Sequence, residues 1–236
     1  MMEYLLGNGL ISDKQYGFIS GRSTSFQLLH MLDKWTDYLE YGGQIDVLYS
    51  DFEKAFDKVP HIRLISKLYS YGRTMVEWIQ DILSERRFRV RVNLSYSLWS
   101  LVTCGIPQGS VLVPILFLIF INDLIKCCIA HSEVYLFADD AKLFKHILSE
   151  SDEQRLQERI NELHVWTKNW LLNLSISKCK VISFGRTDDK SHTYNITDRC
   201  YTDPIDRVNI IKDLEFLQMR NLLLEIILVI KLIRHT

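Results

Sequence analysis

Three aspartates, Asp51, Asp139 and Asp140, are the residues whose types and spacing point most directly to chemistry. Asp139 and Asp140 are adjacent and interrupt the apolar stretch VYLFADDAKLF at residues 134–144. Neighbouring carboxylates repel each other, so a half-buried pair implies a compensating cation. Carboxylate oxygens suit Mg²⁺, and two such ions about 3.5–4 Å apart can activate a hydroxyl nucleophile and stabilise a leaving pyrophosphate.

The elements around these aspartates decide whether they meet. Two apolar arms around a polar pair predict a β-hairpin over 134–144, with the aspartates at its tip. Asp51 directly follows IDVLYS at 45–50, a mostly apolar run that predicts a buried strand. If this strand and the hairpin are neighbours, the three carboxylates converge. The alternative is a solvated turn, because Asp is also a common turn residue.

The remaining pattern alternates between helical and strand periods. Apolar spacing predicts helices over 23–40, over 61–84 with a break near Gly72, after the PQGS turn, and over 153–174. VISF at 181–184 predicts a further strand. The order predicts an α+β fold, an antiparallel sheet with helices packed on one face.

Composition bounds the function classes. The chain has 236 residues, 47% of them hydrophobic, which is enough for a sizeable core, and a formal net charge of -1. A nucleic-acid groove must therefore be local, since phosphate contacts come from Lys and Arg. In FRVRVN (88–93) and the residue before it, Arg87, Arg89 and Arg91 alternate with apolar residues on a predicted strand, which favours a phosphate-tracking strip or a solvated face. The apolar run LLLEIILVIKLI near the end is too short and interrupted for a membrane span.

Five segments in order resemble the reverse transcriptases of non-LTR (LINE-like) retrotransposons. They are QYGFISGRSTSFQLL (15–29), SDFEKAFDKVPH (50–61), CGIPQGSVLVPILFLIFINDL (104–124), YLFADDAKLF (135–144) and WLLNLSISKCKVISFGR (170–186). Any one of these motifs is weak, but five at ordinary spacings are specific. The resemblance covers residues 10 to 185 almost without gaps.

The resemblance implies a polymerase palm and its chemistry. It divides the chain into partial fingers (1–44), a palm with the catalytic motifs (45–186) and a divergent C-terminal tail (187–236) in place of the primer grip and thumb. The implied activity is RNA-directed DNA synthesis, with two Mg²⁺ ions, a dNTP, an RNA template and a DNA primer. No membrane is implied; we expect an intracellular protein, in the nucleus or a cytoplasmic ribonucleoprotein. The sequence indicates no oligomeric state.

By the same resemblance, Asp51 and Asp139 match the two principal metal ligands and Asp140 their less stringent partner. Phe56 matches the steric gate, a ring that excludes a 2′-hydroxyl, although a phenylalanine beside Ala55 is also an ordinary core residue.

Further residues match substrate-binding positions. Gln108 and Gly109 of PQGS match a turn against nucleotide or template, with an ordinary helix-entry loop as the alternative. Arg22 matches a position where a guanidinium could clamp the triphosphate. Lys180 is the candidate proton donor to the leaving pyrophosphate, and Lys178 competes with it.

The sequence also departs from the family pattern. Val113 stands where the family commonly has glycine, and the match fades after residue 214. We therefore expect a truncated fragment that begins inside the fingers and lacks the thumb. A catalytically dead relic that keeps the palm fold is the alternative to an active polymerase. An RNA-dependent RNA polymerase is disfavoured by Phe56 and PQGS.

Overall fold

The computed structural model describes residues 1–107, 109–128, 132–185, 192–197, 201–213 and 216–219. Gln108 therefore lies outside the described residues. Within the described part, no helix is long and apolar enough to cross a membrane.

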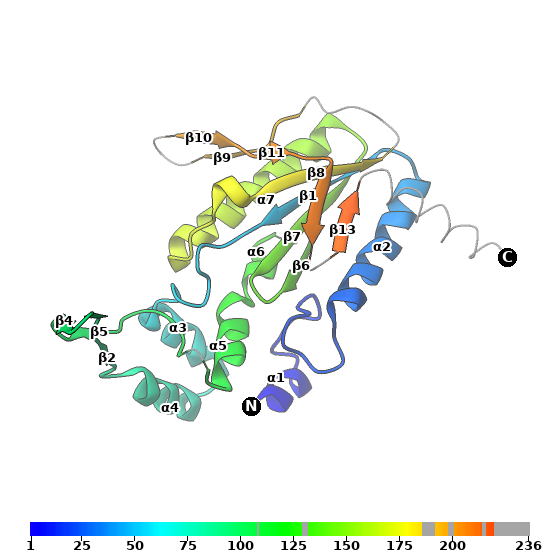
Figure 1. Cartoon of the computed structure of the whole chain (residues 1–236). Coiled ribbons are helices and arrows are strands. Elements are labelled where there is room, and N and C mark those ends of the chain that lie inside the picture. Colours follow the sequence, from blue (N-terminus) through cyan, green and yellow to red (C-terminus); the bar gives the residue numbers. More distant parts are fainter. Residues whose placement is uncertain (108, 129–131, 186–191, 198–200, 214–215, 220–236) are drawn as a thin grey trace.

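A five-stranded sheet forms the centre of the molecule (Figure 1). Its strand order is β11-β8-β1-β7-β6. The strands are β1 (Gln44–Ser50), β6 (Glu133–Phe137), β7 (Asp140–Ile147), β8 (Lys180–Gly185) and β11 (Asp206–Arg207). β1 is antiparallel to both β7 and β8, β6 is antiparallel to β7, and β11 is parallel to β8. Every residue of β1 is buried, as its apolar run predicted.

Helices cover both faces of this sheet. On one face, α2 (Thr24–Glu40) packs Trp35 against Phe144 and Phe184. α5 (Leu112–Ile121), α6 (Leu124–Cys128) and α7 (Glu150–Trp170) contribute to the larger core on the other face. The α+β class is confirmed. The expectation of helices on a single face is corrected, because β1 is buried on both sides and needs two apolar layers.

Below the sheet in Figure 1, shorter helices extend the larger core. They are α1 (Met2–Gly7), α3 (His61–Leu68), the 3₁₀ turn Tyr69–Tyr71 and α4 (Arg73–Leu83). The predicted break is confirmed at Gly72, whose φ of 118° is a conformation that favours glycine.

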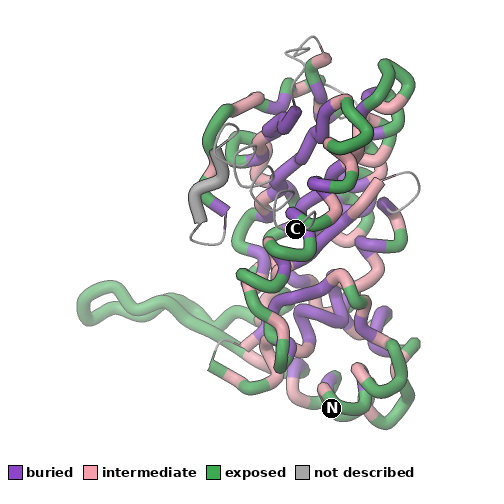
Figure 2. The backbone as a smooth tube through the Cα atoms, turned by 90° about the vertical axis from the view of Figure 1, so that its right-hand side faces the viewer, coloured by how far each residue is buried: buried purple, intermediate pink, exposed green. Residues whose placement is uncertain are grey.

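A two-stranded arm leaves the body after α4 and stands away from it (Figure 2). It contains β2 (Arg87–Phe88), β3 (Arg91–Val92), β4 (Ser95–Tyr96) and β5 (Ser100–Leu101). β2 pairs with β5, and β3 pairs with β4, each antiparallel. The strand predicted from FRVRVN is thus one side of an exposed ribbon.

Part of the segment after residue 186 packs on the central sheet. It contains β9 (Asn195–Thr197), β10 (Thr202–Pro204), β11, β12 (Ile210–Asp213) and β13 (Phe216–Met219), and the last two pair with each other. Asp46, wholly buried in β1, accepts hydrogen bonds from Ser183 at 2.6 Å and Tyr194 at 2.7 Å. Arg207 lies 3.5 Å from the same carboxylate. This segment therefore supplies partners for a charge buried in the central strand.

Candidate active site

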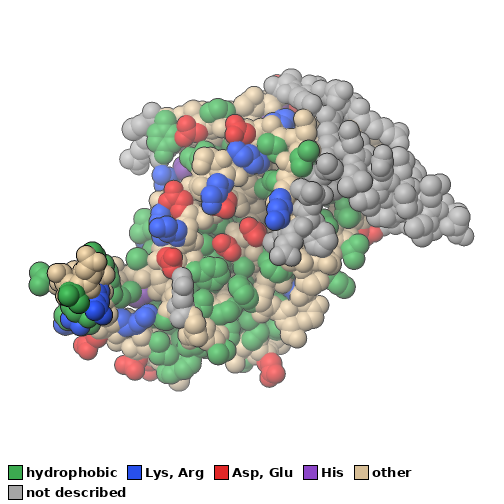
Figure 3. Space-filling model, viewed as in Figure 1, with side chains coloured by type: hydrophobic (Ala, Val, Ile, Leu, Met, Phe, Trp, Pro, Cys, Tyr) green, Lys and Arg blue, Asp and Glu red, His purple; other side chains and the backbone are tan. Residues whose placement is uncertain are grey.

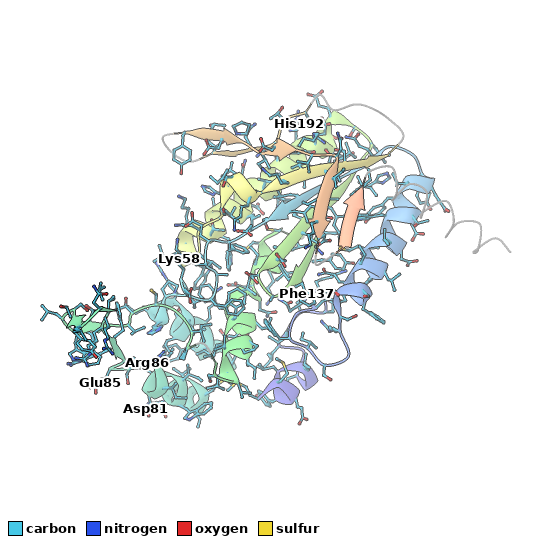
Figure 4. All side chains as sticks on the ribbon, viewed as in Figure 1. Lys58, Asp81, Glu85, Arg86, Phe137 and His192 are labelled. Atoms are coloured by element: carbon cyan, nitrogen blue, oxygen red, sulfur yellow. The ribbon has the colours of Figure 1, made fainter. Side chains whose placement is uncertain are left out.

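The β6–β7 hairpin carries Asp139 and Asp140 at its tip, as predicted. Phe137, at the end of β6 (Figure 4), pairs with Asp140, so the loop is the dipeptide Ala138-Asp139. Ala138 has φ 55°, in the left-handed region that tight hairpin turns require. Asp139 is half-buried, whereas Asp140 is exposed.

The strand register brings Asp51 to this tip. Ser50, the last residue of β1, pairs with Ala141 of β7. Continuing the antiparallel register by one residue sets Asp51 opposite Asp140, and directly opposed residues point to the same face. The strand and the hairpin are therefore neighbours, which was the condition for the three carboxylates to converge.

The negative charges of neighbouring aspartates contribute to the raised pKa values of Asp139 and Asp140. Restricted hydration raises the pKa of Asp140 to about 6, and the charges of Asp139, Asp213 and Asp51 add to this effect while Lys142 opposes it. The pKa of Asp139 is also raised, first by burial and then by Asp51. Such crowding of oxygen ligands suits a divalent cation. No group of three His, Cys, Asp or Glu in the described residues is arranged to hold a metal ion.

The two candidate lysines occupy different places. Lys178, in the 3₁₀ turn Ile176–Lys178, lies 3.3 Å from the Asp51 carboxylate. Lys180 instead donates to Asp206 and to the main-chain oxygen of Ser177, each at 2.7 Å. The structure therefore brings Lys178, rather than Lys180, to the aspartates.

Residues 14–17, in the predicted fingers, form hydrogen bonds with β6 and the hairpin turn. Gln15, almost wholly buried, accepts hydrogen bonds through Oε1 from the main-chain N–H groups of Gly17 at 2.7 Å and Ala138 at 2.9 Å. The neighbouring backbone pairs with β6, since Leu136 N donates to Lys14 O and Tyr16 N donates to Leu136 O. We call this contact, formed by residues 14–17 with Leu136 and Ala138, the hairpin latch.

Gly17 is required for the latch by its close approach. A Cβ at this position would lie 2.3 Å from the Ala138 nitrogen, so any side chain would push the hairpin away. In the sequence, QYGF is visible only as part of a family motif. The buried glutamine before a glycine was the signal available, but its partner lies 123 residues away.

A buried ion pair lies behind Asp140. Lys142, two residues further on the same face of β7, lies 2.7 Å from Asp213 of β12 and donates to Gln27 of α2 at 2.7 Å. Lys142 is 1% exposed, and burial lowers its pKa, while burial raises the pKa of Asp213. Strand alternation from Asp140 is the signal in the sequence that indicates Lys142, which belongs to none of the predicted site residues.

Phe56 lies at the rim of the core. It is half-buried, in a turn rather than a helix, with its ring centroid 4.3 Å from that of Phe117 and 6.2 Å from that of Phe18. Phe56 O also accepts from Ile106 N at 3.0 Å, which ties the segment after Asp51 to the segment before PQGS. Its role as a gate stays a prediction, with one ring face against the core.

The other predicted substrate contacts differ in their surroundings. Gly109 has φ 83° with open space where a Cβ would lie, so the backbone conformation, rather than a crowded contact, favours glycine. Arg22 Nη1 donates to main-chain oxygens of Ser12 at 3.1 Å and Asp13 at 3.0 Å, and to that of Gln15. The Arg22 guanidinium therefore holds the main chain of residues 12–15 in place, next to the hairpin latch. Val113 lies in the first turn of α5 and packs against the larger core.

Comparison with known proteins agrees with the motifs. The sequence model of the family described as "Reverse transcriptase (RNA-dependent DNA polymerase)" matches residues 1–209. The chain is 34% identical over 178 residues to a probable RNA-directed DNA polymerase from transposon BS of Drosophila melanogaster, covering 72% of this chain and 20% of that protein. It is 27% identical over 201 residues to the RNA-directed DNA polymerase from mobile element jockey of Drosophila funebris, covering 78% and 22%. The chain thus spans about a fifth of the length of these relatives.

Solved structures share the fold at low identity. Apo telomerase from Candida tropicalis, truncated from its C-terminal domain, matches with a TM-score of 0.60 and 11% identity over 92% of this chain and 43% of that chain. Telomerase from the same organism in complex with a TWJ fragment of telomeric RNA matches with a TM-score of 0.59 and 11% identity, over 92% and 36%. These likenesses show the fold alone, a polymerase palm.

Proposed function

Because the chain belongs to the reverse transcriptase (RNA-dependent DNA polymerase) family, we propose that its site performs RNA-directed DNA synthesis. The reaction joins the α-phosphate of a dNTP to the 3′-hydroxyl of a DNA primer on an RNA template and releases pyrophosphate. The observation that carries the proposal is the register of β1 and β7, in which Ser50, the residue before Asp51, pairs with Ala141, the residue after Asp140.

The proposed cofactor is a pair of Mg²⁺ ions. Asp51, Asp139 and Asp140 are the residues that would hold them, although no three such side chains of the described residues are already arranged as a metal site. Burial first, and neighbouring carboxylates after it, raise the pKa values of Asp139 and Asp140, and a bound cation would offset both effects. Bound Mg²⁺ would supply Lewis-acid stabilisation of the attacking and leaving oxygens.

The chain's own side chains have separate tasks in this proposal. Phe56 excludes the 2′-hydroxyl of a ribonucleotide with the exposed part of its ring. Lys178, 3.3 Å from Asp51, is better placed than Lys180 to donate a proton to the leaving pyrophosphate. Gly109, Gln108 and Arg22 remain the proposed contacts to nucleotide or template, and the nucleus or a cytoplasmic ribonucleoprotein is the proposed location.

Primer extension tests the proposal. The chain is incubated with poly(rA)–oligo(dT), dTTP and Mg²⁺, and extension of the primer is followed on a gel. We expect Asp139→Asn to abolish extension, whereas Asp81→Asn, an exposed aspartate on α4 (Figure 4), leaves it unchanged. Equal blank results for wild type and Asp139→Asn would instead identify an inactive palm. Incorporation of UTP as readily as dTTP would contradict the role of Phe56.

A further inference from the structure

The arm formed by β2 to β5 has no part in the proposed chemistry, yet it is built in an unusual way. Every residue from 87 to 101 is exposed. Eight of these are large hydrophobic residues with at least 51% of their surface accessible: Phe88, Val90, Val92, Leu94, Tyr96, Leu98, Trp99 and Leu101. An isolated two-stranded ribbon is only marginally stable in water, so this surface calls for a partner.

A β-bulge determines which side chains of the arm lie on the same face. Arg87 pairs with Leu101 and Arg91 pairs with Tyr96, so the returning strand holds one residue more than the outgoing strand between these pairs. An extra residue shifts the alternation of side chains by one position. As a result, Tyr96 and Trp99 share a face with the arginines, although they are three residues apart.

Contacts on this face confirm this arrangement. The Arg89 guanidinium lies 4.0 Å from the ring centroid of Tyr96 and 4.6 Å from that of Trp99. Arg91 lies 5.4 Å from the Tyr96 ring. A guanidinium held on an aromatic ring keeps its N–H donors at the edge and loses less freedom when it binds a phosphate.

The charge of the arm is one-sided. Arg86, Arg87, Arg89 and Arg91 fall in the arm and its base, and no Asp or Glu occurs between Glu85 and Asp123, in a chain whose net charge is -1. Figure 3 shows basic and hydrophobic side chains side by side on the arm. Arginines at every second strand residue are about 6.6 Å apart, an interval suited to successive phosphates of an extended strand.

The base of the arm runs into the proposed active site. After β5, Cys104 forms an isolated antiparallel β-bridge with Pro60. The main-chain N–H of Gly105 then donates to Val59 O at 2.9 Å. Ile106 N then donates to Phe56 O at 3.0 Å. A nucleic-acid strand that follows the arm to its base would therefore reach the segment next to Phe56.

We propose that the arm binds single-stranded RNA, the template on its way to the site. Arg87, Arg89 and Arg91 contact its phosphates, while the exposed surfaces of Tyr96 and Trp99 stack on its bases. The identity of the strand rests on the proposed function. The binding does not, because it requires neither the aspartates nor a dNTP.

Binding is measured by fluorescence anisotropy with a labelled single-stranded RNA of about 20 nucleotides, longer than the roughly 4–16 that one small binding fold covers. EDTA is present and dNTPs are absent. Stacking of one base on an aromatic ring corresponds to roughly a 5- to 150-fold change in affinity, so Tyr96→Ala/Trp99→Ala is expected to weaken binding at least tenfold. Val90→Ala/Val92→Ala, on the opposite face of the arm, is the matched control and keeps the affinity.

The arginines are tested through salt dependence. Each phosphate contact to a single strand contributes about 0.7 to the slope of log affinity against log salt, so the triple change of Arg87, Arg89 and Arg91 to Gln lowers the slope by about two. Arg73→Gln, exposed and paired with Glu77 elsewhere on the surface, keeps it. Thermal melting verifies that these exposed substitutions leave the fold intact.

Three results would overturn the inference. They are RNA affinities within twofold of wild type for both arm variants, a loss confined to single-stranded DNA, or a loss of self-association in sedimentation with RNA affinity unchanged. Asp139→Asn is expected to bind RNA as wild type does. An inactive wild type whose RNA binding still needs the arm would sink the proposed function and leave this inference standing.

Discussion

The carboxyl group of Asp140 holds its proton more tightly than a free aspartate, with a pKa of about 6. Its charged form is disfavoured by restricted hydration and by the negative charges of Asp139, Asp213 and Asp51. A site of this kind stores unfavourable free energy in the folded protein. The residues of the proposed metal site thereby lower the stability of the folded protein, which is a common trade between function and stability.

Asp140→Asn should therefore stabilise the fold in the absence of Mg²⁺. We expect a gain of about 1 kcal/mol at pH 7.5, after allowance for solvent screening of an exposed group. For a chain of this size that corresponds to a rise of about 2–4 °C in Tm, measured by circular dichroism. Asp81→Asn serves as the control. An unchanged or lower Tm for Asp140→Asn would show that restricted hydration and the neighbouring charges do not destabilise the folded protein in solution.

The hairpin latch predicts a catalytic effect from a residue that touches no substrate. Gly17→Ala places a Cβ 2.3 Å from the Ala138 nitrogen and must displace the turn that carries Asp139. Misplacement of a catalytic group by about 1 Å can cost 100-fold, so the rate of primer extension should fall at least tenfold. RNA binding should be unchanged, which separates displacement of the site from a general loss of structure.

Gly7→Ala is the matched control for Gly17→Ala, because nothing lies within 4 Å of a Cβ built at Gly7. Equal extension rates for the two variants would mean that the latch does not set the position of the hairpin.

At the scale of elements, local patterns predicted what local physics decides. Ser23 was expected to begin a helix, and its side chain accepts from Phe26 N at the start of α2. The break at Gly72 and the strand alternation around Arg89 were also visible in the sequence. These features depend on residues a few positions apart, which a single sequence displays.

The contacts between elements were not predictable in the same way. Gln15 meets Ala138, and Lys142 meets Asp213, only after the sheet register and the chain path are fixed. The choice between Lys178 and Lys180 depends on a 3₁₀ turn that shifts which lysine faces Asp51. The position of the three aspartates, at the hairpin tip and at the end of β1, could be predicted from the motifs, whereas the contacts around them could not.

Lys67 connects α3 to α7 and to the residue before α6. Its ammonium lies 2.5 Å from Asp123 and 3.7 Å from the ring centroid of Trp170. Burial lowers its pKa from 10.5 to about 8, although Asp123 opposes the shift. Between about pH 8 and 10.5 the unfolded chain therefore binds more protons than the folded chain, and this group makes stability rise with pH.

Lys67→Met should remove that rise. We expect the free energy of unfolding of the wild type to gain roughly 2 kcal/mol relative to Lys67→Met between pH 7.5 and 10. Urea denaturation of both proteins at the two pH values measures the difference. Parallel pH profiles would contradict the lowered pKa.

At the scale of the whole molecule, the near-zero net charge conceals a separation of charge. The arm is basic, the hairpin tip is acidic, and buried pairs join the palm to residues after 186. Asp46 depends on Tyr194 and Arg207, and Lys142 depends on Asp213. The predicted boundary at 186 is thus crossed by contacts to charges buried inside the sheet.

Arg207→Ala tests one of these contacts. Removing one partner of a buried pair leaves the other charge uncompensated, but Asp46 keeps its bonds to Ser183 and Tyr194. We expect a loss of about 2 kcal/mol, or a fall of roughly 4–8 °C in Tm. Arg155→Ala, whose side chain is 50% exposed on α7, should change Tm by less than about 2 °C.

A chain that ends at Gly185 applies the same argument to the whole molecule. It lacks Tyr194, Arg207 and Asp213 together, so Asp46 and Lys142 lose their ionic partners inside the sheet, and β8 loses the pairing of β11. Uncompensated buried charges cost about 3–5 kcal/mol each, and their sum is comparable with the roughly 5–15 kcal/mol that stabilises a domain. We therefore expect the 1–185 chain to show no cooperative thermal transition by circular dichroism, whereas the 236-residue chain unfolds cooperatively. If the two chains melt with similar cooperativity, the palm does not need these contacts and its boundary lies at 186 as the sequence predicted.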